Sequence, residues 1–127
     1  MKLSDFEMEV MQVIWGEGEC VAPDIHRKIL EERDVSYYSV KTIIDRLEEK
    51  GAVQRLRTYG RTILYGPLVD REEVTGPVVR RFIKRMFAGK ALPLISHVLA
   101  DEELSDKDLD RLEAMVARKR KQREDES

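Results

Sequence analysis

The sequence predicts a mainly α-helical protein with one small β-hairpin, and three observations lead to this prediction. Apolar residues recur at helical spacing through most of the 127 residues. The period shortens to that of β-strands only in residues 52–66. Serine precedes three of the expected helices, where its hydroxyl can cap the first turn. A chain of this length fits one domain, or one small domain with an appendage.

The first two expected helices have recognisable ends. The first begins with the letters SDFE, in which Ser4 is the cap and Glu7 reaches back to its backbone. Gly16 and Gly18 end this helix. The second helix begins around Pro23, because proline suits a first turn, and the letters ERDV interrupt it.

A third helix is expected in SYYSVKTIIDRLEEKG, residues 36–51. Ser36 is a suitable cap and Gly51 a suitable stop. At about 100° per residue, one face of this helix is apolar and consists of Val40, Ile43, Ile44 and Leu47. The opposite face begins with tyrosine, serine, lysine and threonine, and its acidic residues come late. This polar leading end is therefore the part of the helix that most needs a functional explanation.

Two short β-like runs follow around the letters TYGR, and Gly60 supplies the positive φ that a tight hairpin often needs. We expect Val53, Ile63 and Tyr65 to pack on one side of the hairpin, and Pro67 to close its second strand. Three helices followed by a β-hairpin is the order of a winged helix-turn-helix. Residues 1–68 are therefore predicted to form a winged helix domain.

Residues 69–127 are predicted to be helical, with apolar stripes at 78–87, 92–99 and 109–116. The first of these helices should begin or bend at Gly76 and Pro77. Three short helices cannot bury this much apolar surface by themselves, and a second copy of the chain is the simplest partner. We therefore expect a helical dimerisation region. Its predicted contact residues are Phe82, Ile83, Met86, Ile95, Leu99, Leu109, Leu112 and Val116.

The net charge is −2, but the charges are unevenly distributed. Residues 50–69 contain four basic residues and no acid, and residues 74–100 contain five basic residues and no acid. A basic face on an acidic protein is typical of nucleic-acid binding, because screening limits each charge to about 8 Å at physiological salt.

Helix-turn-helix proteins place the start of their second helix in the major groove of double-stranded DNA. The leading residues of the third expected helix fit this role, and the hairpin after it fits a wing that binds phosphate. The alternative for the helix is an ordinary solvated face, and one of the adjacent tyrosines, Tyr37, is expected to pack rather than bind. The predicted recognition-helix residues are Tyr38, Ser39, Lys41, Thr42 and Arg46, and the predicted wing residues are Arg55, Arg57, Tyr59, Gly60 and Arg61.

Other site chemistries have little support in the sequence. Cys20 is the only cysteine, so no internal disulfide can form, and His26 and His97 are the only histidines. No catalytic or metal-binding spacing is present, so we expect neither an enzyme nor a metal or cofactor. The N-terminus lacks the apolar run of a signal peptide and no segment could span a membrane, which predicts a cytoplasmic protein. The basic run 118–123 is interpreted as a solvated helix end, with a phosphate-binding tail as the alternative.

Several of these patterns together resemble the penicillinase-repressor family, also called the BlaI/MecI/CopY type. The first helix has the pattern Glu-x-x-Val-Met-x-x-Ile-Trp at residues 7–15, and the third ends in Asp-Arg-Leu-x-x-Lys-Gly at residues 45–51. The letters RFIKRMFAG at 81–89 and the LS before the last helix also match. The resemblance implies a homodimeric transcriptional repressor that binds palindromic operators.

In the antibiotic-resistance branch of that family, a membrane sensor protease triggers cleavage at an Asn-Phe bond in the penultimate helix. Here His97 and Val98 stand at that position, so the resemblance leaves cleavage open. The paired Cys-x-Cys motifs of the copper-sensing branch are absent from this sequence. A winged-helix protein-interaction adaptor and a ligand-sensing regulator remain as alternatives.

Overall fold

The computed structural model describes residues 1–101 and 103–127. The chain forms two compact units, Met1–Val79 and Arg80–Ser127. The division between the units falls inside a helix, whereas the sequence placed the functional boundary between residues 68 and 69. That functional boundary remains a prediction.

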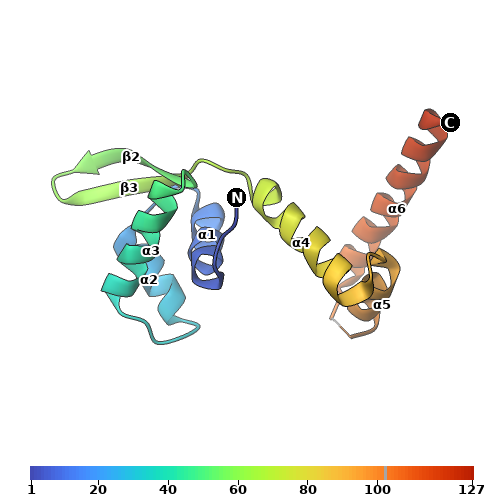
Figure 1. The fold of residues 1–127 in the computed structure, drawn as a ribbon, viewed down its shortest axis with the longest axis horizontal. Helices are drawn as coiled ribbons and strands as arrows, with labels where there is room; N and C mark the ends of the chain where they lie inside the picture. Colours follow the sequence, from blue (N-terminus) through green and yellow to red (C-terminus); the bar gives the residue numbers. More distant parts are fainter. Residues whose placement is uncertain (102) are drawn as a thin grey trace. The chain divides into compact units, whose positions relative to one another are not determined.

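The first unit has the element order of a winged helix (Figure 1), as the sequence predicted. Its three strands form one antiparallel sheet in the order β1-β3-β2. The two-residue strand β1 was not predicted, and it pairs through Cys20 with Tyr65 and through Val21 with Leu64. The elements are α1 (Asp5–Glu17), β1 (Cys20–Val21), α2 (Ala22–Leu30), α3 (Tyr37–Glu49), β2 (Val53–Tyr59), β3 (Thr62–Pro67) and the first part of α4 (Arg71–Phe87).

The predicted caps form real hydrogen bonds. The backbone N of Glu7 donates to Ser4 Oγ over 3.1 Å, and the backbone N of Ser4 donates to Glu7 Oε1 over 2.7 Å. The backbone N of Ser39 donates to Ser36 Oγ over 3.1 Å and so fixes the start of α3. These bonds satisfy amide groups that have no partner within the helix.

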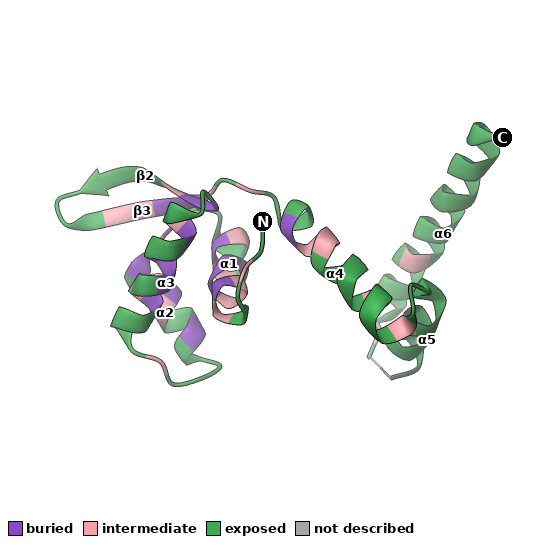
Figure 2. Cartoon of the chain, in the orientation of Figure 1, coloured by how far each residue is buried: buried purple, intermediate pink, exposed green. Residues whose placement is uncertain are grey.

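The core of this unit lies between α1, α2, α3 and the sheet. The predicted inner face of α3 is buried: Val40, Ile44 and Leu47 have no exposed surface, and Ile43 is 5% exposed. Figure 2 shows the buried residues of the three helices on the sides that face one another. Glu7 is also buried, and its carboxylate lies 2.7 Å from the ammonium of Lys50, the C-cap residue of α3. This ion pair joins the start of α1 to the end of α3.

The hairpin of β2 and β3 projects from the helices (Figure 1). A register shift between Arg55 and Arg57 places a bulge at Leu56. The Leu56 side chain lies over Gly66, where an added Cβ would come within 2.7 Å of Leu56 Cδ1. A residue with a side chain at position 66 would therefore displace Leu56 or the strand. The predicted packing of Val53, Ile63 and Tyr65 on the core is confirmed.

The segment after β3 is attached to the winged helix by Trp15. The indole Nε1 of Trp15 donates to the carbonyl of Val69 over 2.9 Å, and the Arg71 guanidinium lies 5.6 Å from the centre of the Trp15 ring system. Helix α4 begins at Arg71, not at Pro77, and Val74 is buried against this unit. Pro77 is accommodated in the second turn of the helix, and the residues of α4 from Arg80 onward belong to the other unit.

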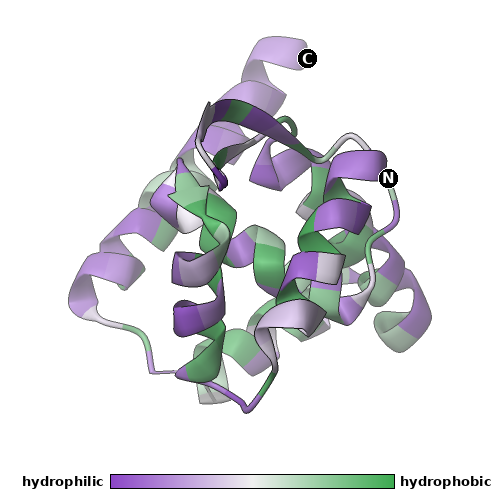
Figure 3. Ribbon diagram, turned by 90° about the vertical axis from the view of Figure 1, so that its left-hand side faces the viewer, coloured by the Kyte–Doolittle hydropathy of each residue, from purple (hydrophilic) through white to green (hydrophobic). Residues whose placement is uncertain are grey.

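The second unit consists of the end of α4, α5 (Ala91–Asp101) and α6 (Asp106–Glu126). Ser105 caps α6, as expected, and Asp108 completes a capping box that was not predicted. No residue that the structure describes in this unit is buried, and Figure 2 shows α5 and α6 almost entirely as exposed. In Figure 3 the last turns of α6 beside the C-terminus are hydrophilic. Within the described ranges, no helix has the length and apolarity needed to cross a bilayer.

Candidate nucleic-acid interface

The leading end of α3 presents an exposed polar face. Tyr38 is 82% exposed, and Ser39, Thr42 and Arg46 are exposed beside it. Because the buried stripe fixes the rotation of α3, these side chains must face away from the core. The structure therefore places four of the five predicted recognition residues on one accessible surface.

The hydroxyl of Ser39 is already part of the helix cap. Ser39 Oγ lies 2.9 Å from Ser36 Oγ, which also accepts the backbone N–H of Ser39. A new partner for this hydroxyl would have to share it with the cap. Tyr38 and Thr42 have more freedom, since no hydrogen bond restrains either side chain within the part of the chain that the structure describes.

The two neighbouring tyrosines have different environments. The Tyr37 ring packs edge-on against His26, with 5.9 Å between the ring centroids. His26 Nε2 in turn lies 2.8 Å from the carbonyl oxygen of Val35 and holds the turn before α3. The Tyr38 ring lies edge-on to Tyr37, with 6.4 Å between the ring centroids, but Tyr38 is 82% exposed. The expected packing role of Tyr37 is confirmed, and a DNA contact by Tyr38 remains a prediction.

Lys41 differs from the other predicted cations because it is half-buried. Its ammonium lies 2.6 Å from Asp45 Oδ1, one helical turn later. Burial by itself lowers the pKa of Lys41, but the oxygen atoms of Asp45 and Tyr65 outweigh this effect, and the pKa is raised overall. Lys41 is thus a fixed cation at physiological pH.

The acidic residues at the end of α3 are neutralised in part. Glu48 binds Arg55 of β2 through two hydrogen bonds, from Arg55 Nε over 2.7 Å and from Nη2 over 3.2 Å. The carboxylate of Glu48 raises the pKa of Arg55. This pair joins the recognition helix to the wing, so Arg55 is less available for phosphate than its position in the sequence suggested. Glu48 and Arg55 are 7 residues apart and lie on different elements, so the sequence alone could not identify them as a pair.

The cations without partners lie on the outer surface. Among the residues that the structure describes, neither Arg46 nor Arg61 has a hydrogen bond or an ion pair. The wing turns at Gly60, which has the predicted positive φ of 60°. Arg57 Nη1 lies 3.3 Å from the hydroxyl of Tyr59, which is 60% exposed. The predicted wing residues Arg57, Tyr59, Gly60 and Arg61 therefore share the exposed end of the hairpin.

The predicted dimerisation residues are brought together in the second unit. An apolar groove of about 410 Å³ lies between α5 and α6, and five of the eight predicted residues line it together with Glu113. The remaining three are on α4, where Phe82 and Met86 are 46% and 63% exposed. The groove residues are Ile95, Leu99, Leu109, Leu112 and Val116.

The remaining reactive side chains have structural surroundings. Cys20 is buried, and burial together with the nearby acids Glu17 and Asp24 raises the pKa of its thiol to about 11. A thiol with this pKa is almost entirely protonated near neutral pH and is a poor nucleophile. In the described parts of the chain, no group of His, Cys, Asp and Glu side chains is arranged to hold a metal ion.

A winged helix with an exposed polar recognition helix and a basic wing defines a class of protein, the winged-helix DNA-binding transcription regulators. Comparison with known families narrows this class. The family model described as penicillinase repressor matches residues 3–118. The chain therefore belongs to the penicillinase repressor family, and the sequence-based assignment is confirmed.

Relatives of the chain match along almost its full length. The methicillin resistance regulatory protein MecI of Mammaliicoccus sciuri is 27% identical over 118 residues, which cover 93% of this chain and 95% of MecI. The penicillinase repressor of Staphylococcus aureus is 24% identical, and the match covers 88% of each chain.

Solved structures support the fold. The solution structure of the DNA-binding domain of the repressor BlaI has a TM-score of 0.52 and 29% identity, over 57% of this chain and 87% of that chain. The complex structure of hsRosR-S1 has a TM-score of 0.55 over 92% of this chain and 91% of that chain, at 18% identity. This second likeness concerns the fold alone, and it extends beyond the winged helix.

Proposed function

We propose that the protein is a sequence-specific DNA-binding transcriptional repressor that acts as a homodimer on a palindromic operator. The observation that carries the proposal is the charge arrangement of α3 and the wing. Asp45 and Glu48 are each paired with a cation, whereas Arg46 and Arg61 have no partner among the described residues. A DNA backbone would therefore meet unpaired positive charge on this surface. The similarity to the DNA-binding domain of BlaI supports the same assignment.

The mechanism that follows is steric occlusion. The start of α3 enters the major groove, where Arg46 and Thr42 reach base edges, and the wing residues Arg57 and Arg61 neutralise phosphate. In a dimer the second recognition helix enters the next major groove on the same DNA face, about 34 Å away. A promoter covered in this way is closed to RNA polymerase.

The second unit supplies the dimer contact in this proposal. All of the apolar groove residues lie on α5 and α6, and no described residue of the unit is buried. Exposing this much apolar surface to water is unfavourable, so a second copy of the same unit is the expected cover. The S. aureus and M. sciuri relatives span the same region.

Release of DNA is proposed to occur through this second unit. When one subunit binds its half-site, the second subunit is held at a high effective concentration near the other half-site. Any signal that separates the dimer therefore lowers operator affinity without changing α3. Proteolysis by a membrane sensor is one form of such a signal. His97 and Val98 lie inside α5, and the His97 ring packs against Phe87 with 5.9 Å between centroids. A protease would have to unwind α5 locally to reach the bond between them.

The decisive experiment is a salt titration of binding to the DNA upstream of the regulated gene. A protein that contacts several phosphates loses affinity linearly on a log–log plot against salt, with a slope of about −0.9 per phosphate. Preference for one palindrome over competitor DNA should persist as salt rises. Absent or salt-independent binding would favour the adaptor alternative, in which the polar face of α3 is only solvated. Salt-dependent but equal binding to all DNA would contradict the sequence specificity in the proposal.

A further inference from the structure

A small pocket lies beside the candidate interface, at the point where α2, α3 and β3 meet. Its volume is about 90 Å³, and it is lined by the first residues of α2, by Tyr37 and Lys41 of α3, and by Arg61 to Ile63 and Tyr65 of the hairpin. Pockets for drug-sized molecules are several times larger, at about 300–1,000 Å³. This pocket therefore has room for a single small group.

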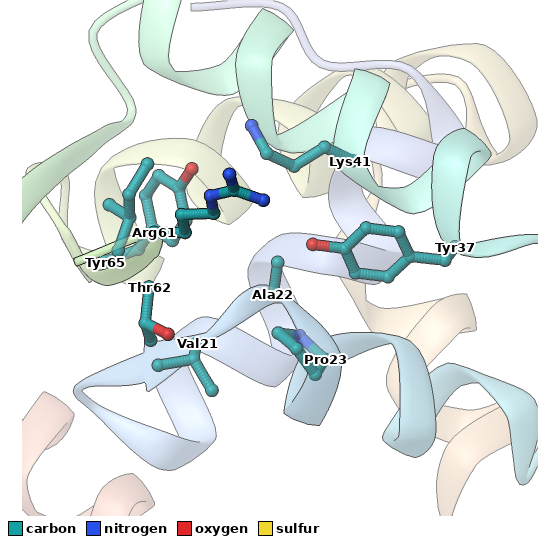
Figure 4. Close-up of a pocket in the computed structure, with 9 residues that line it drawn as sticks. Val21, Ala22, Pro23, Tyr37, Lys41, Arg61, Thr62 and Tyr65 are labelled. Atoms are coloured by element: carbon teal, nitrogen blue, oxygen red, sulfur yellow. The ribbon is translucent and has the colours of Figure 1, made fainter. Parts of the chain in front are cut away.

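The polar groups around the pocket favour an anion. Figure 4 shows the Tyr37 hydroxyl and the Arg61 guanidinium pointing towards each other across the pocket, with the ammonium of Lys41 above them. The walls also include Ala22 and Pro23 in the first turn of α2, a helix of 9 residues. The start of a helix carries partial positive charge and favours negatively charged groups.

Tyr65 provides an independent reason to expect a ligand. Its side chain lines the pocket and is 1% exposed. Its hydroxyl oxygen is near enough to Lys41 to contribute to the raised pKa of that residue, but it is buried and makes no hydrogen bond of ordinary geometry among the described residues. A buried hydroxyl normally has a partner, because leaving it unpaired is unfavourable. Phenylalanine would fill the same core position without this disadvantage, so the hydroxyl is unexplained by packing.

We propose that this pocket is a binding site for one phosphate-type oxyanion, held by Arg61, Lys41 and the hydroxyl of Tyr65. Arg61 has no other partner among the described residues, and its fork of N–H groups suits phosphate oxygens. The ammonium of Lys41 lies 2.6 Å from a carboxylate oxygen of Asp45, which neutralises one of the two positive charges of Lys41 and Arg61. A net positive charge remains for the anion.

The oxyanion has two sources, a phosphate of bound DNA or a free phosphate ion. The DNA source rests on the proposed function and adds Tyr65 to the expected DNA contacts, a residue that the sequence assigned to the core alone. Binding of a free phosphate ion does not depend on the proposed function. A bound phosphate ion would make DNA binding sensitive to phosphate beyond the effect of ionic strength.

The first test is a titration of the full-length protein with inorganic phosphate, followed by backbone amide NMR and matched at each point for ionic strength with chloride. We expect saturable shifts at Val21, Ala22 and Thr62 that chloride does not produce. Arg61→Gln should abolish these shifts, and Tyr65→Phe should weaken phosphate binding several-fold. Arg57→Gln, which removes a wing charge outside the pocket, should leave them unchanged.

The second test is a double-mutant cycle on operator affinity. If a DNA phosphate occupies the pocket, Arg61→Gln and Tyr65→Phe should have non-additive effects, whereas Arg57→Gln and Tyr65→Phe should add. If phosphate binds but both cycles are additive, the ligand is the free ion. Circular dichroism and thermal unfolding of Tyr65→Phe should show that the buried ring still supports the fold.

The inference is overturned if phosphate causes no saturable shift beyond chloride and both cycles are additive. Specific, salt-dependent operator binding in that case would leave the proposed function intact. Absence of operator binding by the wild-type protein would instead remove the proposed function, and the phosphate titration would still decide whether the pocket binds an anion.

Discussion

The two units of the chain have similar proportions of apolar residues but use them in opposite ways. In the winged helix, Val10, Ile14, Ile25 and Ile44 have no exposed surface. In the second unit, Leu99 is 50% exposed and Val116 is 55% exposed, although both lie on regular helices with apolar stripes. The winged helix has three helices and a sheet to enclose a core, and the second unit has no such second layer. The first unit can therefore be stable by itself, and the second is expected to depend on a partner.

The largest expected effect comes from a charge placed in the apolar groove. Leu99→Glu should separate the dimer, because a carboxylate buried in an apolar contact loses its hydration. Operator affinity should fall by about 10²–10⁴-fold, while affinity for a half-site should be unchanged. Analytical ultracentrifugation and DNA-binding titrations measure the two quantities. A dimer that persists in Leu99→Glu would place the contact elsewhere.

The matched control for this change is Leu30→Glu in α2. Leu30 is 43% exposed, close to the value for Leu99, but it lies in the winged helix. This variant should remain a dimer and should bind half-site and full operator in the same ratio as the wild type.

The next largest effect concerns stability to unfolding, and the two units should differ in how this stability depends on protein concentration. Ile44→Ala should lower the free energy of unfolding by about 2–5 kcal/mol through a core cavity, at any protein concentration. Leu112→Ala should destabilise the protein mainly at low concentration, because its cover comes from the second chain. Thermal unfolding over a hundredfold range of concentration checks both. If Leu112→Ala were insensitive to dilution, the second unit would be stable alone.

A smaller effect is expected on the recognition face. Arg46→Ala should cost about 1–3 kcal/mol of operator binding and relax specificity at one position, if Arg46 reads a base edge. Arg27→Ala removes an exposed cation of α2 that is paired with Asp24 and should change binding little. Binding titrations on the operator and on single-base variants distinguish these outcomes. Equal losses on all sequences would make Arg46 a phosphate contact.

The smallest effect concerns acid stability of the winged helix. Burial by itself raises the pKa of Glu7, but hydrogen bonds from Lys50 and Ser4 outweigh it and hold the pKa below its ordinary value of 4.5. The stability that Glu7 contributes is therefore complete above about pH 4.5 and is lost as the pH falls through the lowered pKa. Because Lys50 is 40% exposed, solvent screening makes this contribution modest.

Glu7→Gln should unfold more easily at neutral pH and should lose less stability than the wild type between pH 5 and pH 3. Glu49→Gln, which changes an exposed acid of α3, serves as the control and should follow the wild-type profile. Urea unfolding at several pH values measures the difference. A wild-type profile for Glu7→Gln would show that the buried ion pair with Lys50 contributes nothing to stability.

The helices and the hairpin of this protein could be predicted from the sequence, because the signals for them are local. The Ser4 and Ser105 capping boxes, the cap at Ser36 and the turn at Gly60 each depend on residues within a few positions of one another. Periodicity then identified the inner face of α3 correctly, since burial follows the helical repeat.

The contacts between residues that are distant in the sequence became visible only in the folded chain. The two residues of β1 are too few to show a strand pattern, and this strand exists because β3 offers it a free edge. Lys41 and Asp45 have the spacing of an ordinary helical pair, but Glu48 with Arg55 and Glu7 with Lys50 require the meeting of separate elements. The packing of α2, α3 and the hairpin also places Tyr65, which the sequence pattern assigned to the core, in the same pocket as Arg61. The sequence therefore identified which face of α3 is exposed, and the fold determined which of its charges remain unpaired.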